Sequence, residues 1–191
     1  MQKIYTKTGD SGQTSLYTGQ RVVKSDPVIE AIGAVDECNS AVGLAIAHLP
    51  SSSPCAQVRD ELTRIQHALF DVGAAIATPR TTASSKKIAC TRFDKESTEL
   101  LEKWMDAMEK ELPALHTFIL PGGHPAGAQL HLARSLCRRA ERAAVPLNQH
   151  ADVSDHVLMY LNRLSDYLFV ASRYVNKLLG CPETLWEHHK E

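Results

Sequence analysis

Residues 155–178 read DHVLMYLNRLSDYLFVASRYVNKL, and the spacing of their apolar side chains decides the fold class. Apolar residues recur there every three or four positions, which is the period of one face of a helix. Ser154 or Asp155 is suited to cap the N-terminus of that helix. The apolar stripe consists of Val157, Leu161, Leu164, Leu168, Ala171, Val175 and Leu178. The stretch therefore predicts a long amphipathic helix with one face in a core.

Four more helices are predicted upstream from the same kind of stripe. Their start signals are Asp26 followed by Pro27, Ser53 before Pro54, Asp94, and the Pro121-Gly122-Gly123 turn, after which a helix runs to about Leu147. No strand is convincing. Mostly short links make successive helices antiparallel neighbours, so we expect an all-α fold, a five-helix bundle.

The chain is predicted to be a single domain over residues 1–191, because 191 residues can bury one sizeable core. Residues 1–25 are rich in Gly, Thr, Ser and Lys and lack helical periodicity, so they are expected to form an irregular N-terminal segment ahead of a bundle at 26–180. The link 78–93 also lacks a clear period, which makes it a candidate functional loop.

Composition excludes several classes of protein. Apolar residues make up 43% of the chain and charged residues 23%, and the formal net charge of −1 argues against nucleic acid as a partner. The five cysteines contain no C-x-x-C pair, so neither a disulfide framework nor a protein metal site is expected. No secretory signal and no apolar run long enough for a membrane span is present, so we expect a cytoplasmic protein.

The segment 6–15, TKTGDSGQTS, concentrates hydroxyl groups, a lysine and two glycines. Such a loop can turn backbone N–H groups toward phosphates. The alternative is a flexible tail, since loops of this composition are common. A Walker A motif is absent from the chain, which disfavours a P-loop kinase or ATPase.

Arg134, Arg138 and Arg142 recur every four residues along the fourth predicted helix. Like charges at that spacing destabilise a helix unless an anion or acidic residues neutralise them. The planar guanidinium group of arginine suits the oxygens of a triphosphate. The alternative is a solvated basic face relieved by Glu141.

Polar side chains also lie beside the apolar stripes at Asn162 and Asp166, and at Asp36 and Asn39. Buried polar groups need partners, so these residues are either structural pairs or members of a site, and for Asn39 we favour the structural role. No nucleophile or acid–base pair stands out among the side chains. A reaction whose nucleophile arrives with a cofactor would fit that pattern.

Five motifs together resemble the PduO-type ATP:cob(I)alamin adenosyltransferases, over positions 3 to about 175. In chain order they are YTKTGD at 5–10, AVDE at 34–37, FILPGG at 118–123, RRAER at 138–142 and YLNRLSDYLF at 160–169. The resemblance implies a homotrimer with active sites between subunits, and an N-terminal segment that binds ATP. It also implies transfer of the 5′-deoxyadenosyl group of ATP to Co(I) of cob(I)alamin, giving adenosylcobalamin and triphosphate.

The resemblance assigns two groups of residues to ATP. One subunit would supply Thr6, Lys7, Thr8, Gly9, Thr14, Ser15 and Lys24. The next subunit would supply Arg138, Arg139, Ala140, Glu141, Arg142 and Asn162. Mg²⁺ is expected with the triphosphate, held mainly by phosphate oxygens and water.

The residues expected to carry the chemistry are Arg138, Phe118, Asp36, Arg134 and Asn162. In the family, Phe118 would displace the axial base of the corrinoid, Arg138 would contact the leaving triphosphate, and Asp36 and Arg134 would form an intersubunit salt bridge. A reductase that supplies the electron and an adenosylcobalamin-dependent enzyme are further partners that the resemblance suggests.

This chain departs from the family at His124-Pro125-Ala126-Gly127, where a proline and an extra glycine follow the Pro-Gly-Gly turn. Lys86 and Lys87 are both candidates for a phosphate contact, and the sequence does not choose between them. A corrinoid- or nucleotide-binding sensor or chaperone without turnover is one alternative function. A purely structural helical module is another, and it predicts no nucleotide binding.

Overall fold

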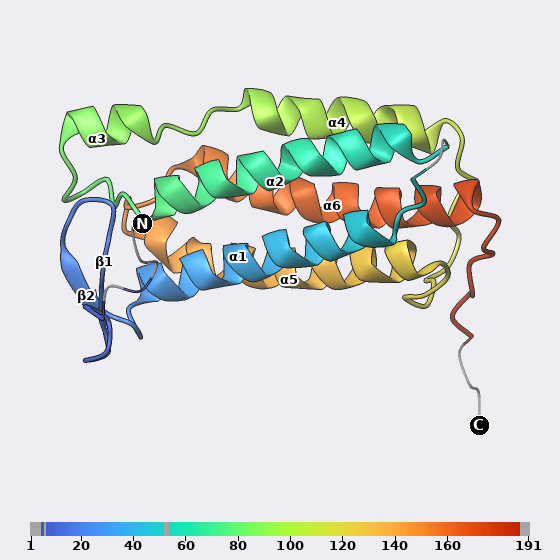
Figure 1. Cartoon of the computed structure of the whole chain (residues 1–191). Helices are drawn as coiled ribbons and strands as arrows, with labels where there is room; N and C mark the ends of the chain where they lie inside the picture. The colour runs from blue at the N-terminus through green and yellow to red at the C-terminus, as the bar shows by residue number, and fades with distance from the viewer. Residues whose placement is uncertain (1–4, 6, 52–53, 188–191) are drawn as a thin grey trace.

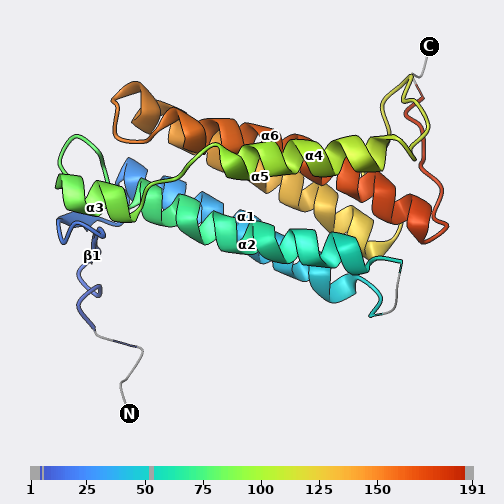
Figure 2. The same cartoon turned by 90° about the horizontal axis from the view of Figure 1, so that it is seen from above.

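The chain folds into a bundle of long helices, shown as a computed structural model in Figure 1 and from above in Figure 2. The structure describes residues 5, 7–51 and 54–187. The helices are α1 Pro27–His48, α2 Ala56–Ile76, α3 Ser85–Cys90, α4 Glu96–Glu109, α5 Pro125–Gln149 and α6 Asp155–Leu178. The all-α prediction is confirmed, and all five predicted helices are present.

The cap at the start of α1 forms as predicted, because Asp26 Oδ1 accepts a hydrogen bond of 2.9 Å from the backbone N–H of Val28. Ser154 occupies the N-cap position of α6, although its side chain makes no capping hydrogen bond. Two predicted starts differ from the structure. Helix α2 begins at Ala56, with Cys55 in the cap position, and Ser53 lies outside the described residues.

The start of α4 was wrongly predicted at Asp94. The helix begins at Glu96 after Lys95, because the Asp94 carboxylate forms an ion pair with Arg92 instead of capping the helix. The link 78–93 was predicted without regular structure but contains the six-residue helix α3. The Ser84 side chain caps α3 by accepting a hydrogen bond of 3.4 Å from the backbone N–H of Lys87.

The N-terminal segment is more regular than the sequence predicts. Residues Gln13–Ser15 (β1) and Arg21–Val23 (β2) form an antiparallel hairpin in which Thr14 pairs with Val22. The tip contains Gly19 at φ +86°, a backbone conformation that suits glycine. Three-residue strands are too short to show an alternating pattern, which is why the hairpin was missed.

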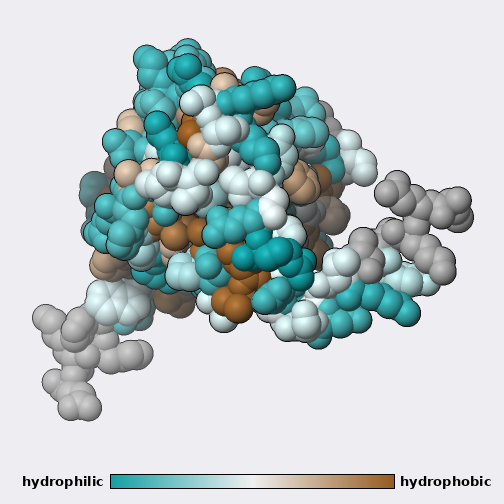
Figure 3. All heavy atoms as spheres, turned by 90° about the vertical axis from the view of Figure 1, so that its left-hand side faces the viewer, coloured by the Kyte–Doolittle hydropathy of each residue, from teal (hydrophilic) through white to brown (hydrophobic). Residues whose placement is uncertain are grey.

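The helices pack so that α5 lies between α1 and α6, while α2 packs on α1 and α4 packs on α6. Figure 1 shows the hairpin and α3 at one end of the bundle, and the start of α5 with the end of α6 at the other. The hairpin end of the surface is mostly hydrophilic, with small hydrophobic patches between polar side chains (Figure 3). Among the described residues, none of the helices has both the length and the hydrophobicity that a membrane span requires.

Candidate functional site

The outer surface where α5 and α6 meet brings together two residues that the sequence assigned to one site. Asn162 Nδ2 donates a hydrogen bond of 2.8 Å to Glu141 Oε1, joining the two helices. Arg138 and Arg142 are exposed on the same helix as Glu141, and neither forms an ion pair with a described residue. Because no carboxylate neutralises them, these guanidinium groups are available to an anion.

Arg134 also lies where α5 meets α6, and it is half-buried. Its guanidinium carbon is 5.7 Å from the centre of the Phe169 ring on α6, a cation–π contact. The same ring packs edge-on against His131 at 6.0 Å. The Arg134 side chain is therefore held in place by an aromatic ring rather than by a carboxylate.

His131 was missed by the sequence analysis, because a lone histidine on an apolar face carries no pattern. Ser172 Oγ donates a hydrogen bond of 2.7 Å to the Phe169 carbonyl and lies 3.1 Å from His131 Nε2, so Nε2–H is the donor to Ser172. Burial lowers the pKa of His131, and the positive charge of Arg134 lowers it further. The imidazole under Arg134 is therefore neutral at physiological pH.

The other edge of α5 faces α1. There Arg139 forms an ion pair with Glu37, while Ala140 is buried in the helix interface. Asp36 is exposed on α1 and forms no ion pair with Arg134 or any other described residue. Asp36 and Arg134, which were expected to pair with each other, thus each have no ion-pair partner among the described residues.

The N-terminal segment turns back on itself, and an arginine that the sequence analysis missed organises it. Arg21 Nη2 donates a hydrogen bond of 2.9 Å to the carbonyl of Thr8, and Arg21 Nη1 donates one of 3.4 Å to Ser15 Oγ. Lys7 adopts φ +59°, in the left-handed region. Thr6, another predicted residue, lies outside the described residues.

Gly9 and Lys24 come close together in this segment. The Gly12 N–H donates to the Gly9 carbonyl at 3.2 Å, and the Lys24 N–H donates to the Gly12 carbonyl at 2.9 Å. A Cβ at Gly9 would lie 3.4 Å from Lys24 Nζ, so the ammonium group sits against the glycine backbone. Thr14 and Ser15 follow on β1. Six of the predicted residues, Lys7, Thr8, Gly9, Thr14, Ser15 and Lys24, thereby lie on the hairpin or in the residues that flank it.

Lys87 and Lys86 differ in their surroundings. Lys87 Nζ donates hydrogen bonds to the carbonyls of Thr18 at 2.7 Å and Tyr17 at 3.2 Å, and it lies 5.8 Å from the centre of the Tyr17 ring. Lys87 therefore ties α3 to the tip of the hairpin. Lys86 is exposed.

The segment that precedes α5 and contains Phe118 lies at the opposite end of the bundle from the hairpin (Figure 1). The Phe118 ring is 78% exposed and packs edge-on against Trp186 at 6.2 Å. The Trp186 N–H donates to the Phe118 carbonyl at 2.8 Å, and Ile119 forms a β-bridge with Leu185. Trp186 was not predicted from the sequence, although two adjacent large apolar residues, Leu185 and Trp186, in an otherwise polar segment could have indicated a contact with the rest of the fold.

The structure does not bring the two predicted halves of the site together in one chain. No hydrogen bond or ion pair of Thr14, Ser15 or Lys24 reaches α5 or α6 within the described residues. Both halves instead lie on outer surfaces.

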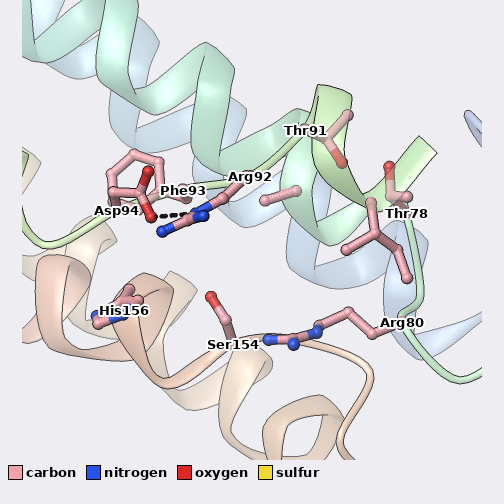
Figure 4. Close-up of a pocket in the computed structure, with 10 residues that line it drawn as sticks. Thr78, Arg80, Thr91, Arg92, Phe93, Asp94, Ser154 and His156 are labelled. Carbon is pink, nitrogen blue, oxygen red and sulfur yellow. Dashed lines mark hydrogen bonds and ion pairs between the residues drawn. The ribbon is translucent and has the colours of Figure 1, made fainter. Parts of the chain in front are cut away.

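A pocket of about 330 Å³ lies elsewhere, between the end of α2, α3 and the start of α6 (Figure 4). Its polar lining includes Arg80, Arg92, Ser154 and His156, and Asp94 pairs with Arg92 at its edge. None of the residues that the sequence predicted for the site lines this pocket. The pocket is therefore separate from the predicted site.

Comparison with known proteins gives a consistent result. Residues 4–175 match the family model described as cobalamin adenosyltransferase. The chain is 43% identical over 187 residues to the corrinoid adenosyltransferase MMAB of Mus musculus, covering 98% of this chain and 78% of that protein. It is also 43% identical to the corrinoid adenosyltransferase of Bacillus subtilis, covering 97% and 92% of the two chains.

A solved structure resembles the fold over nearly its whole length. It is a variant of the PduO-type ATP:corrinoid adenosyltransferase from Lactobacillus reuteri, complexed with cobalamin and ATP. The TM-score is 0.89 at 40% sequence identity, and the match covers 97% of this chain and 100% of that one.

Proposed function

Because the chain belongs to the cobalamin adenosyltransferase family, we propose which of its residues move the 5′-deoxyadenosyl group of ATP to Co(I) of cob(I)alamin. In this reaction the electron pair of Co(I) attacks the C5′ carbon of the ribose. The C5′–O bond breaks, and triphosphate leaves with that bond's electron pair, so adenosylcobalamin and triphosphate are the products. The protein's tasks are to align the two substrates and to stabilise the leaving anion.

Arg138 is the main contact of the leaving triphosphate in this proposal, and Arg142 assists it. The supporting observation is that both are exposed beside the Glu141–Asn162 hydrogen bond and have no ion-pair partner among the described residues. This arrangement is the single observation that carries the assignment, because it places two unpaired arginines beside the Glu141–Asn162 hydrogen bond. Arg139 contributes less directly, since it pairs with Glu37.

Glu141 and Asn162 hold the nucleoside. Their mutual hydrogen bond of 2.8 Å uses one carboxylate oxygen of Glu141 and one N–H of Asn162. The second carboxylate oxygen and the amide oxygen stay available as acceptors. Acceptors of this kind suit the hydroxyl groups of a ribose.

The N-terminal segment of a neighbouring copy covers the nucleotide in the proposed homotrimer. Thr6, Lys7, Thr8, Gly9, Thr14, Ser15 and Lys24 would bind ATP from that copy. Support comes from Thr14, Ser15 and Lys24, which make no hydrogen bond or ion pair with α5 or α6 within the described residues. Asp36 and Arg134, each without an ion-pair partner in the described chain, would form the salt bridge between copies.

Phe118 faces the lower side of the corrinoid in this proposal and displaces its axial base. Four-coordinate cobalt is easier to reduce to Co(I), which prepares the nucleophile. The supporting observation is a large apolar ring that is 78% exposed, although burying it would be favourable. A flat apolar surface of a substrate would cover this ring.

Mg²⁺ enters with the triphosphate and is held by phosphate oxygens and water, as suits this ion. Within the described residues no group of three or more His, Cys, Asp or Glu is arranged to hold a metal. We place the enzyme in the cytoplasm, which fits five cysteines that are all free thiols. A reductase and an adenosylcobalamin-dependent enzyme are its proposed functional partners.

The test is an anaerobic assay with ATP, Mg²⁺ and chemically reduced cob(I)alamin, which follows absorbance to adenosylcobalamin. We expect turnover by the wild type and a fall in kcat of about 100-fold in Arg138→Ala, the usual effect of removing one group that stabilises a developing anion. Arg92→Ala is the matched control, because Arg92 is equally a surface arginine but lies outside the site. A wild type that binds both substrates without turnover would support the sensor or chaperone function instead.

A further inference from the structure

Asn176 is a buried asparagine near the C-terminus of α6, and all of its amide groups contact the turn that precedes α5. Its side chain is almost inaccessible, with the residue 3% exposed. Asn176 Nδ2 donates a hydrogen bond of 3.0 Å to the Gly122 carbonyl, and Asn176 Oδ1 accepts one of 3.0 Å from the His124 N–H. One side chain thus fixes both sides of the Pro-Gly-Gly turn.

The backbone approaches Asn176 so closely that two neighbours must be glycine. A Cβ at Gly123 would lie 2.5 Å from the Asn176 amide, and Gly123 also adopts φ +92°. A Cβ at Gly127 would lie 2.3 Å from Asn176 Oδ1. Glycine inside a helix is unfavourable by about 1 kcal/mol relative to alanine, so Gly127 sacrifices helix stability for this contact. The extra glycine that departs from the family pattern therefore has a physical reason.

Asn176 also anchors the C-terminal segment. Its backbone carbonyl accepts a hydrogen bond of 2.9 Å from the Cys181 N–H, where the chain leaves α6. The segment that follows pairs with the Phe118 strand through two backbone hydrogen bonds of 2.8 Å, Leu120 N–H to the Thr184 carbonyl and Trp186 N–H to the Phe118 carbonyl. Asn176 thus contacts the turn at 122–124, which follows Phe118, and the start of the C-terminal segment that pairs with Phe118.

An exposed ring has few packing contacts to fix its position, so its backbone must do so. Phe118 is 78% exposed, and the described contact of its ring is the edge-on packing with Trp186. The two hydrogen bonds of the Asn176 side chain are partly buried, and a hydrogen bond shielded from water is stronger than an exposed one. The turn is therefore held by a rigid helix rather than by solvent-exposed contacts.

We propose that Asn176 is a positioning residue for Phe118, which holds the turn at 122–124 against α6 so that the ring is presented to the corrinoid at a fixed place. The inference rests on the role proposed above for Phe118. Asn176 does not touch the substrate. It acts through the backbone of the turn and of the C-terminal segment.

The experiment uses full-length protein with four variants. Asn176→Ala removes both side-chain hydrogen bonds, and Gly127→Ala displaces the amide by adding a methyl group at its oxygen. The double variant Asn176→Ala/Gly127→Ala tests the coupling of the two residues. Asn39→Ala is the matched control, because Asn39 is a buried asparagine, 6% exposed, whose amide donates to the Gln66 carbonyl away from the turn.

Three readouts separate positioning from general destabilisation. The first is the pair of values kcat and KM for ATP in the anaerobic assay, measured separately for each variant. The second is the absorption spectrum of cob(II)alamin bound with ATP, which reports loss of the axial base. The third is hydrogen exchange of the backbone in peptides covering residues 113–124 and 181–187, which needs no activity.

In Asn176→Ala we expect kcat to fall by about 100-fold, the size of effect that a misplacement of about 1 Å produces. KM for ATP should stay unchanged, the four-coordinate spectrum should weaken, and exchange should accelerate in the two peptides. Gly127→Ala should do the same, and the double variant should be no worse than Asn176→Ala alone. Asn39→Ala should lower the melting temperature without changing kcat or the spectrum.

A folded Asn176→Ala that keeps its kcat and its spectrum overturns the inference, and so does an Asn39→Ala that loses as much. If the wild type itself shows no turnover, the proposed function fails. Hydrogen exchange then tests separately whether Asn176 holds the turn and the C-terminal segment in place. Unchanged exchange in both peptides would refute the positioning role in that case.

Discussion

Replacing Glu183 by glutamine should destabilise the protein strongly, because Glu183 neutralises a buried arginine. Arg173 Nε donates to Glu183 Oε1 at 2.7 Å, and Arg173 Nη2 donates to Glu183 Oε2 at 3.3 Å and to the Pro113 carbonyl at 3.0 Å. The side chains of Arg173 and Glu183 are only 8% and 20% exposed. The pair therefore ties α6 both to the C-terminal segment and to the loop that leads to Phe118.

The magnitude follows from burial. Removing one partner of a buried ion pair costs about 3–5 kcal/mol, because the other charge is left uncompensated. We expect about 3 kcal/mol here, the lower end of that range, since water reaches part of Glu183. For a chain of this size that corresponds to a fall in melting temperature of roughly 6–12 °C.

The assay is thermal unfolding at a fixed protein concentration, with Glu99→Gln as the control. Glu99 forms an ion pair of nearly the same length with Lys95, 2.8 Å, but both side chains are about half exposed. An exposed pair contributes little, so the control should leave the melting temperature unchanged. Replacing both Arg173 and Glu183 by methionine should destabilise less than Glu183→Gln, because no buried charge then remains. Equal melting temperatures for Glu183→Gln and Glu99→Gln would refute the reasoning.

Three further predictions concern the site. Asn162→Ala should weaken ATP binding by about 10-fold, because it removes the 2.8 Å hydrogen bond to Glu141 and one acceptor for the nucleoside; calorimetry that finds an unchanged Kd would contradict this. His131 has a pKa below the ordinary histidine value of 6.5, so the unfolded chain binds its proton first as pH falls. The free energy of unfolding should therefore decrease as the pH falls below 6.5, until the pH reaches the lower pKa of His131 in the folded state. The melting temperature of His131→Gln should fall less than that of the wild type over the same pH range, and equal falls for the two proteins would count against this prediction. Lys87→Ala should free the hairpin tip by removing the 2.7 Å hydrogen bond to the Thr18 carbonyl, and trypsin should then cut near the hairpin faster than in Lys86→Ala, whereas equal rates would argue against a tether.

The sequence predicted some parts of the candidate site better than others. Glu141 and Asn162 were each recognisable, and the structure joins them by a hydrogen bond. Asp36 was recognisable as a polar residue beside an apolar stripe, and Arg134 as part of the arginine repeat on the fourth predicted helix. Their pairing stays a prediction, because it depends on a second copy of the chain. A pattern along one chain contains no information about distances between chains.

Arg21, His131, Asn176 and Trp186 were not predicted. The last three act through contacts with residues far away in the sequence, such as His131 with Ser172 or Trp186 with Phe118. Arg21 instead contacts Thr8 and Ser15 within the N-terminal segment. Gly127 was noticed as an unusual residue, but its reason is the Asn176 side chain that lies against it. Only the packing of α5 on α6 reveals that contact.

The sequence by itself determined the helices, because each buries a stripe of apolar residues whose period is a local property of the chain. It also determined the start of α1, since the Asp26 cap and Pro27 act within one turn. Only the tertiary structure decided that Asp94 pairs with Arg92 rather than capping α4, that residues 13–23 form a hairpin, and that a turn of α5 rests on Asn176. The contact between Asn176 and the turn is non-local, because its groups meet only after α6 has packed on α5. The Asp94–Arg92 ion pair and the hairpin join residues close together in the sequence, but the sequence pattern did not show which of the competing local contacts would form.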